Sequence, residues 1–135
     1  MSGSLAPVIK NDYKVLVVDD DPDGATTLSM LLELAGFEAE SAHDGPSALR
    51  AAMEFRPDAV VLDVGLPGLD GYQVARHLRS SPELHGIVLI ALTGYGQDAD
   101  LERSRQAGFD HHFVKPTDPS TICEVLAHYA ALHRQ

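Results

Sequence analysis

The stretch that decides the fold is Lys14-Val15-Leu16-Val17-Val18-Asp19-Asp20, close to the start of the chain. An unbroken aliphatic run that ends in acids is typical of a strand buried on both faces of a parallel sheet, because a half-exposed strand would alternate apolar and polar residues. A helix is predicted directly after it, with Asp21 as its N-cap, Pro22 at the first helical position and Gly36 at its end. The predicted fold therefore begins with a strand followed by a helix.

The same alternation of strand and helix continues to the end of the chain. Four more short apolar runs are predicted to be strands, at residues 37–41, 59–63, 87–92 and 109–114. Helices are predicted after Asp44, after Asp70, from about Gln97 to Ala107, and after Asp118. Five such units indicate an α/β fold in which right-handed crossovers build a parallel sheet covered by helices on both faces. A sheet of this class binds ligands at the carboxyl ends of its strands.

Polar residues follow several of these predicted strands. Asp19 and Asp20 come after the first strand, Asp63 ends the third, Thr93 follows the fourth and Lys115 follows the fifth. Carboxylates that converge on one point repel each other unless a hard cation neutralises them. Mg²⁺ suits that need, since it prefers oxygen ligands and commonly takes one or two carboxylates. We therefore expect a magnesium site at this edge of the sheet.

Four sequence motifs occur together and in order. They are Val-Leu-Val-Val-Asp-Asp at 15–20, Leu-Asp-Val-Gly-Leu-Pro-Gly-Leu-Asp-Gly at 62–71, Ala-Leu-Thr-Gly at 91–94 and Phe-Val-Lys-Pro at 113–116. In these motifs the chain resembles the receiver domains of response regulators, the family that includes the chemotaxis regulators, over about residues 13–133. The resemblance implies a doubly wound sheet with the flavodoxin-like strand order 2-1-3-4-5.

The resemblance also implies a function for the acidic residues. Asp63 would accept a phosphoryl group from a histidine kinase or a histidine phosphotransfer domain, as one step of a two-component phosphorelay. Asp19 and Asp20, with Asp63 and the backbone carbonyl of Gly65, would hold the Mg²⁺ cofactor. The protein would then be a phosphorylation-activated signalling switch, able to catalyse its own phosphorylation and dephosphorylation. The stretches from Gly65 and from Gly108 resemble receivers of hybrid histidine kinases.

Three further residues fit the same resemblance, and a fourth departs from it. Thr93 would hydrogen-bond a phosphoryl oxygen after transfer, and Lys115 would pair with the same group. Pro116 fits the cis peptide that the family has after this lysine. His112 lies three residues before Lys115, where the family usually places Tyr or Phe. The resemblance therefore leaves open whether His112 works as the switch residue.

Several conspicuous residues have simpler interpretations. Asp21 and Asp70 are expected to be helix caps, and Cys123 a small packed side chain. His111 and His112 do not suggest a metal site, because neighbours on a strand point to opposite faces.

Length, composition and charge restrict the remaining possibilities. The 135 residues suit one domain, expected at 12–135 after a flexible arm at 1–11. A net charge of −10 argues against direct binding of nucleic acid. The absence of a long apolar run and of a signal peptide, together with a single cysteine, predicts a cytoplasmic protein that does not enter the membrane.

Two other functions fit the sequence less well than the receiver interpretation. The stretch Asp21-Pro22-Asp23-Gly24 loosely resembles the nucleophile motif of haloacid-dehalogenase-like phosphatases, but it begins two residues too far from the apolar run. A nucleotide-binding module would need a glycine-rich phosphate loop after the first strand, where this chain has acids instead.

Overall fold

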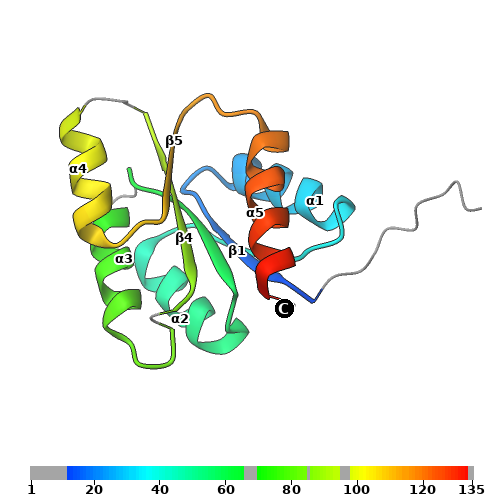
Figure 1. Ribbon diagram of the computed structural model, residues 1–135, viewed down its shortest axis with the longest axis horizontal. Coiled ribbons are helices and arrows are strands. Elements are labelled where there is room, and N and C mark those ends of the chain that lie inside the picture. Colours follow the sequence, from blue (N-terminus) through cyan, green and yellow to red (C-terminus); the bar gives the residue numbers. More distant parts are fainter. Residues whose placement is uncertain (1–11, 66–69, 85, 95–97, 134–135) are drawn as a thin grey trace, which may run out of the picture.

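The computed structural model describes residues 12–65, 70–84, 86–94 and 98–133, with the side chains of 98–101 left undescribed. Strands and helices alternate along the chain as predicted (Figure 1). The elements are β1 (Lys14–Val18), α1 (Pro22–Leu34), β2 (Glu38–Ala42), α2 (Gly45–Phe55), β3 (Ala59–Asp63), α3 (Gly71–Ser80), β4 (Val88–Thr93), α4 (Asp98–Ala107), β5 (His111–Val114) and α5 (Pro119–His133).

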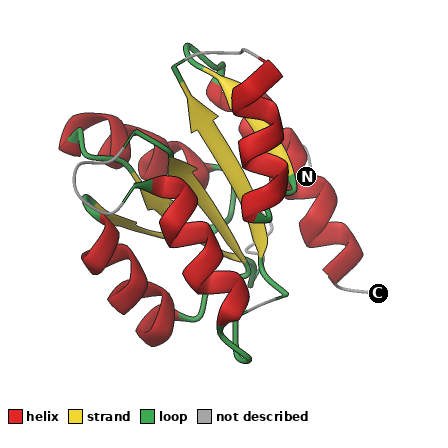
Figure 2. Cartoon of the chain, turned by 90° about the vertical axis from the view of Figure 1, so that its left-hand side faces the viewer, coloured by secondary structure: helices red, strands yellow, loops and turns green. Residues whose placement is uncertain are grey.

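The five strands form one parallel sheet in the order β2-β1-β3-β4-β5. This confirms both the fold class and the strand order. Helices α1 and α5 cover one face of the sheet, and α2, α3 and α4 cover the other (Figures 1 and 2). Each face has its own apolar core, one built mainly with residues of α2 and α3 and the other with residues of α1 and α5. The strand order changes direction between β1 and β3, so the switch point lies at the carboxyl ends of these two strands.

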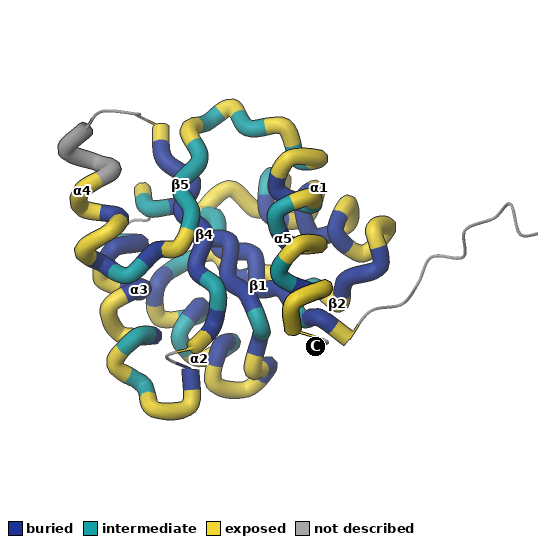
Figure 3. The backbone as a smooth tube through the Cα atoms, in the orientation of Figure 1, coloured by how far each residue is buried: buried dark blue, intermediate teal, exposed yellow. Residues whose placement is uncertain are grey.

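Hydrophobicity separates the central strands from the edge strands. β3 is Ala-Val-Val-Leu-Asp and is buried throughout, as are four of the five residues of β1 (Figure 3). The edge strands β2, with sequence Glu-Ala-Glu-Ser-Ala, and β5, with sequence His-His-Phe-Val, are more polar and more exposed. The central strands thus carry residues that suit burial by helices on both sides.

Two predicted strands begin later than expected because glycine caps use their first residues. Gly36 has a φ of 102°, and the N–H of Phe37 donates to the carbonyl of Leu32 at 3.0 Å, closing the end of α1. Gly108, with a φ of 98°, and Phe109 end α4 in the same way. Both ends are Schellman motifs, in which a left-handed glycine precedes a buried apolar residue. β2 and β5 therefore start at Glu38 and His111 instead of residues 37 and 109.

The other predicted boundaries agree to within a residue. β4 spans Val88–Thr93 instead of 87–92, since the N–H of Ile87 donates to Leu84 in the preceding turn. Gln97, the predicted start of the fourth helix, and the expected arm at 1–11 lie outside the described residues.

Acidic caps begin three of the helices as predicted. The side chain of Asp21 accepts from the N–H of Asp23, and that of Asp44 accepts from the N–H of Ser47. Asp70 forms a reciprocal capping box with Gln73. These three side chains therefore cap the starts of α1, α2 and α3.

Gly71 allows α3 to begin directly against the end of β3. A Cβ at this position would collide with the backbone of Val64 and lie 2.9 Å from the carbonyl oxygen of Asp63. We predict that Gly71→Ala destabilises the domain by about 1–3 kcal/mol, because overpacking against backbone outweighs the gain in helix propensity of up to ~1 kcal/mol. Urea denaturation measures the change.

Gly86→Ala is the matched control, since nothing lies within 4 Å of an added Cβ there. Its effect should stay within about 0.5 kcal/mol, as for most surface substitutions. Equal stability of the two variants would contradict the close approach of α3.

Candidate functional site

Three carboxylates meet at the carboxyl edge of the sheet. Asp19 and Asp20 follow β1 and Asp63 is the last residue of β3, and one oxygen from each side chain lies within 4.8 Å of the others. Asp63 is buried, Asp19 is half-buried and Asp20 is exposed. The structure therefore brings together the three acids that the sequence predicted would converge.

Lys115 reaches this cluster from the loop after β5. Its Nζ donates to Oδ2 of Asp63 at 2.9 Å and lies 3.8 Å from Oδ2 of Asp19. The backbone N–H of Lys115 donates to the carbonyl of Thr93 at 2.7 Å, and the bond from Lys115 to Pro116 is cis, as expected. Lys115 is thus held against Asp63, 52 residues away in the sequence.

The charges of the cluster shift the pKa values of its members. Partial burial lowers the pKa of Lys115, but the hydrogen bond to Asp63 and the surrounding carboxylates outweigh burial and raise it overall. Burial raises the pKa of Asp19, and the negative charges of Asp63 and Asp20 add to this. The hydrogen bond from the Asp21 N–H and the charge of Lys115 only partly offset the increase. Three acids facing one lysine leave an excess of negative charge, which favours a bound cation.

Gly65 lies beside Asp63, as the resemblance requires. Its N–H donates to Oδ1 of Asp63 at 2.9 Å, so the two carboxylate oxygens of Asp63 are held by different donors. The expected role of the Gly65 carbonyl as a metal ligand stays a prediction.

Thr93 lies at the same edge, at the end of β4 next to β3, and is only 3% exposed. Its Oγ1 is 3.1 Å from Nε2 of His112, whose Nδ1 is 2.8 Å from Oγ of Ser104. The neighbouring His111 instead bonds the hydroxyl of Tyr129 in α5. The two histidines point to opposite faces of the sheet, which agrees with the prediction that they do not chelate one ion.

The sequence did not indicate the contacts of Ser104 and His43. Ser104 is an ordinary helical serine in the sequence, and only the packing of α4 on β5 places it against His112. Nδ1 of His43 lies 3.2 Å from the carbonyl oxygen of Asp19. No local pattern could have identified either residue, because both contacts join separate elements.

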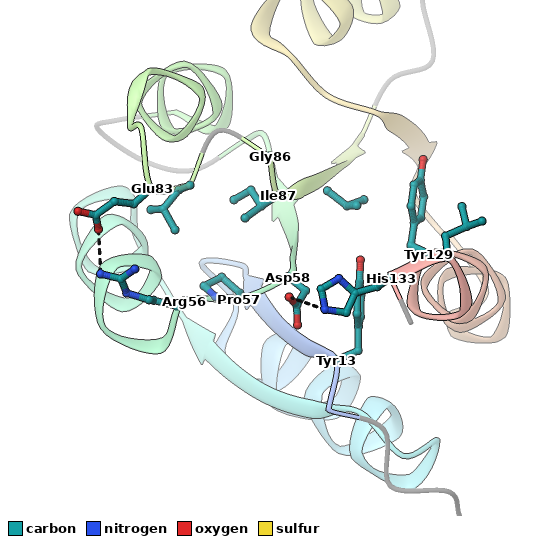
Figure 4. Close-up of a pocket in the computed structure, with 12 residues that line it drawn as sticks. Tyr13, Arg56, Pro57, Asp58, Glu83, Gly86, Ile87, Tyr129 and His133 are labelled. Carbon is teal, nitrogen blue, oxygen red and sulfur yellow. Dashed lines mark hydrogen bonds and ion pairs between the residues drawn. The ribbon is translucent and has the colours of Figure 1, made fainter. Parts of the chain in front are cut away.

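Two hollows lie in different parts of the molecule. One, of about 350 Å³, is lined by Asp19 and Lys115, by polar residues of α1 that include Asp23 and Thr27, and by apolar residues of α1, β4 and α5, and so opens beside the acidic cluster. The other, of about 470 Å³, lies at the opposite end of the sheet (Figure 4). There Arg56 pairs with Glu83, and Asp58 with His133. In the second hollow, each of these two acids thus lies against a nitrogen-bearing side chain.

The fold and the site together define a doubly wound α/β domain with a carboxylate cluster and a lysine at its switch point. The family model of the response regulator receiver domain matches residues 15–127. The chain belongs to this family, which acts in two-component signalling. The phosphatase and nucleotide-binding alternatives are excluded by this membership, and Asp21 acts as a helix cap.

Known proteins of the family are similar in sequence and structure. The transcriptional regulatory protein PrrA of Mycobacterium tuberculosis is 40% identical over 122 residues, which is 90% of this chain and 50% of PrrA. The chemotaxis response regulator CheY4 of Vibrio cholerae superposes with a TM-score of 0.81 at 29% identity, over 87% of this chain and 98% of CheY4. The chain spans about half the length of the curated relatives it matches.

A third relative has a metal in its structure. The receiver domain of the sensor histidine kinase PA1611 from Pseudomonas aeruginosa has a magnesium ion coordinated in its active site cleft. It superposes with a TM-score of 0.80 at 30% identity, over 89% of this chain and 98% of that domain.

Among the residues described for the present chain, every helix is too short or too polar to span a membrane.

The raised pKa of Asp19 predicts a pH-dependent effect of Asp19→Asn in metal-free buffer. The folded domain holds the Asp19 proton more tightly than the unfolded chain, so wild-type stability falls as the pH rises through the range of this carboxyl. The variant lacks this penalty and its Oδ1 still accepts from the Asp21 N–H. Urea midpoints should therefore favour the variant at pH 7, with an advantage that disappears below about pH 4.

Asp44→Asn is the control of opposite sign. The Ser47 N–H lowers the pKa of Asp44, so wild type should be the more stable at pH 7 and lose its advantage as the pH falls through the Asp44 range. A loss of stability in Asp19→Asn at pH 7 would mean that attraction to Lys115 exceeds the burial and repulsion described.

Proposed function

We propose that Asp63 accepts a phosphoryl group from a phosphohistidine of a histidine kinase or a phosphotransfer domain. The observation that carries this proposal is the environment of Asp63, a buried carboxylate bonded to Lys115 and grouped with Asp19 and Asp20. Among the described acids, Asp63 is the one that has all of these features, and it lies at the end of a central strand.

The chemistry is a displacement at phosphorus. A carboxylate oxygen of Asp63 attacks the phosphorus, the bond from phosphorus to the donor imidazole nitrogen breaks, and that nitrogen keeps the electron pair. The product is an acyl phosphate on Asp63. Catalysis then consists mainly of positioning and of neutralising charge on the transferred group. Lys115 supplies one positive charge at hydrogen-bond distance from the attacking carboxylate.

Asp19, Asp20 and Asp63 are the residues that would hold Mg²⁺, with the backbone carbonyl of Gly65 as a further ligand. Their oxygens are the hard donors that this ion prefers, and their spacing suits shared coordination. When bound, Mg²⁺ neutralises charge on the transferring phosphoryl group. The magnesium in the related receiver of PA1611 supports this assignment.

Thr93 would donate its hydroxyl hydrogen to a phosphoryl oxygen, while Lys115 pairs with another. Both residues lie at the edge of the sheet where Asp63 ends β3. After phosphorylation, these contacts would stabilise the state in which Thr93 faces the phosphoryl group relative to a state in which Thr93 is turned away from it. This difference in contacts supports a switch between two states.

The domain itself is not proposed to bind nucleic acid. Its sequence has a net charge of −10, which disfavours contact with a phosphate backbone. The relative MtrA of Mycolicibacterium smegmatis is named a DNA-binding response regulator, and this chain aligns with 46% of it. We propose that binding to DNA in such a protein belongs to its unaligned half.

The first test is phosphorylation by acetyl phosphate with Mg²⁺, followed by intact-mass spectrometry. Wild type should gain one phosphoryl group and Asp63→Asn none, since the variant lacks the attacking carboxylate. Asp21→Asn is the matched control, because its side chain caps α1 outside the acidic cluster. It should be phosphorylated like wild type. The same mass gain on Asp63→Asn would overturn the assignment.

The second test is a thermal shift with Mg²⁺. At a tenfold excess over its dissociation constant the ion should stabilise the domain by about 1.4 kcal/mol. For a domain of this size that corresponds to a rise of about 3–6 °C in Tm. Asp63→Asn should shrink this increment because it removes one of the three carboxylates.

Asp58→Asn serves as the control for the metal site. Asp58 binds the Lys14 N–H and pairs with His133 at the opposite end of the sheet, so its replacement should lower the baseline Tm but retain the Mg²⁺ increment. An equal increment in wild type and Asp63→Asn would show that the ion binds elsewhere.

A further inference from the structure

A continuous chain of side-chain hydrogen bonds runs from the carboxyl edge of the sheet into α4. His112 lies at its centre, with Nε2 at 3.1 Å from Oγ1 of Thr93 and Nδ1 at 2.8 Å from Oγ of Ser104. Thr93 is 3% exposed and Ser104 is 2% exposed. Both hydroxyls are therefore shielded from bulk water, which would otherwise compete for these bonds.

The register of β4 and β5 produces this arrangement. His112 is paired with Ala91, two residues before Thr93. Residues two apart on a strand share a face, so Thr93 and His112 project to the same side of the sheet. Ala91 belongs to the apolar core that also contains Ala107 of α4, which places this side under α4. Ser104 meets the ring from that helix.

Counting hydrogens restricts the direction of these bonds. A hydroxyl has one hydrogen, and a neutral imidazole has one N–H and one acceptor nitrogen. If Thr93 gives its hydrogen to a phosphoryl oxygen on Asp63, its oxygen can interact with His112 only as an acceptor. Nε2 must then carry the ring proton, Nδ1 becomes the acceptor, and the Ser104 hydroxyl must donate to it. Without the phosphoryl group, both directions fit the two observed distances.

We propose that His112 is a positioning residue that aims the Thr93 hydroxyl at the phosphoryl group and reports its presence to α4 through Ser104. The signal is the direction of the hydrogen-bond chain, and it requires no large movement of the ring. This inference rests on the proposed phosphorylation of Asp63. A phenylalanine at position 112 would fill similar space but make neither bond.

The test uses the whole chain with ¹⁵N-labelled histidine, near pH 8, where an ordinary imidazole is neutral. Beryllium fluoride with Mg²⁺ serves as the phosphoryl mimic. The ring nitrogens of His112 are observed by long-range proton–nitrogen correlation and assigned by their loss in His112→Phe. We expect a protonated Nε2 and an unprotonated Nδ1 in the bound state. A ring protonated at Nδ1 in that state would overturn the proposal.

Ser104→Ala tests the connection to α4. This substitution removes the last hydroxyl of the hydrogen-bond chain and leaves the side chains of Thr93 and His112 in place. The backbone amide shifts that the mimic causes at residues 102–107 should fall by about half or more, while those at Asp63 and Lys115 persist. Ser29→Ala is the matched control, since Ser29 is a buried helical serine in α1 whose hydroxyl has no hydrogen-bond partner among the described residues.

The proposed phosphorylation of Asp63 and the role of His112 can fail separately. Equal responses of residues 102–107 in Ser104→Ala and Ser29→Ala would overturn the role of Ser104 and hence this inference. If wild type showed no shifts at Asp63 and Lys115, the proposed phosphorylation would fail and this inference would fall with it. Shifts at those two residues with a His112 ring protonated at Nδ1 would overturn this inference alone.

Discussion

The repulsion among the three carboxylates at the carboxyl edge of the sheet is the constraint on which the site depends. Parallel strands end at the same edge, so acids placed after β1 and β3 must come together. Lys115 relieves part of this repulsion through its 2.9 Å bond to Asp63. The remaining negative charge is available to attract a cation and, with it, a phosphoryl group. The same negative charge that destabilises the metal-free domain therefore favours binding of the cation that phosphoryl transfer requires.

The rest of the fold holds these charges in place. Buried aliphatic strands in the centre of the sheet fix the ends of β1 and β3, and Gly71 lets α3 start directly against Asp63. Asp21 and Asp70 anchor the starts of α1 and α3 on either side of the cluster. Gly71 and the two caps thus help to set the position of the cluster without contributing a ligand.

The face between β4, β5 and α4 differs in chemistry from the acidic cluster. It contains a polar chain built from the two buried hydroxyls of Thr93 and Ser104 and the half-buried imidazole of His112. Such a chain has directional preferences that an aromatic hydrocarbon ring lacks. A receiver domain with His112 can therefore couple its site to α4 by hydrogen-bond direction, where ring packing would serve in a relative with Phe.

The sequence by itself determined the alternation of strands and helices, the caps and the acids at the strand ends, because each follows from local patterns of hydrophobicity and turn chemistry. It misplaced the starts of β2 and β5, since Phe37 and Phe109 close glycine caps on the preceding helices. Only the tertiary structure decided that Lys115 bonds Asp63 and that His112 joins Thr93 to Ser104. These contacts depend on strand register and helix packing, which bring together residues that no local pattern connects.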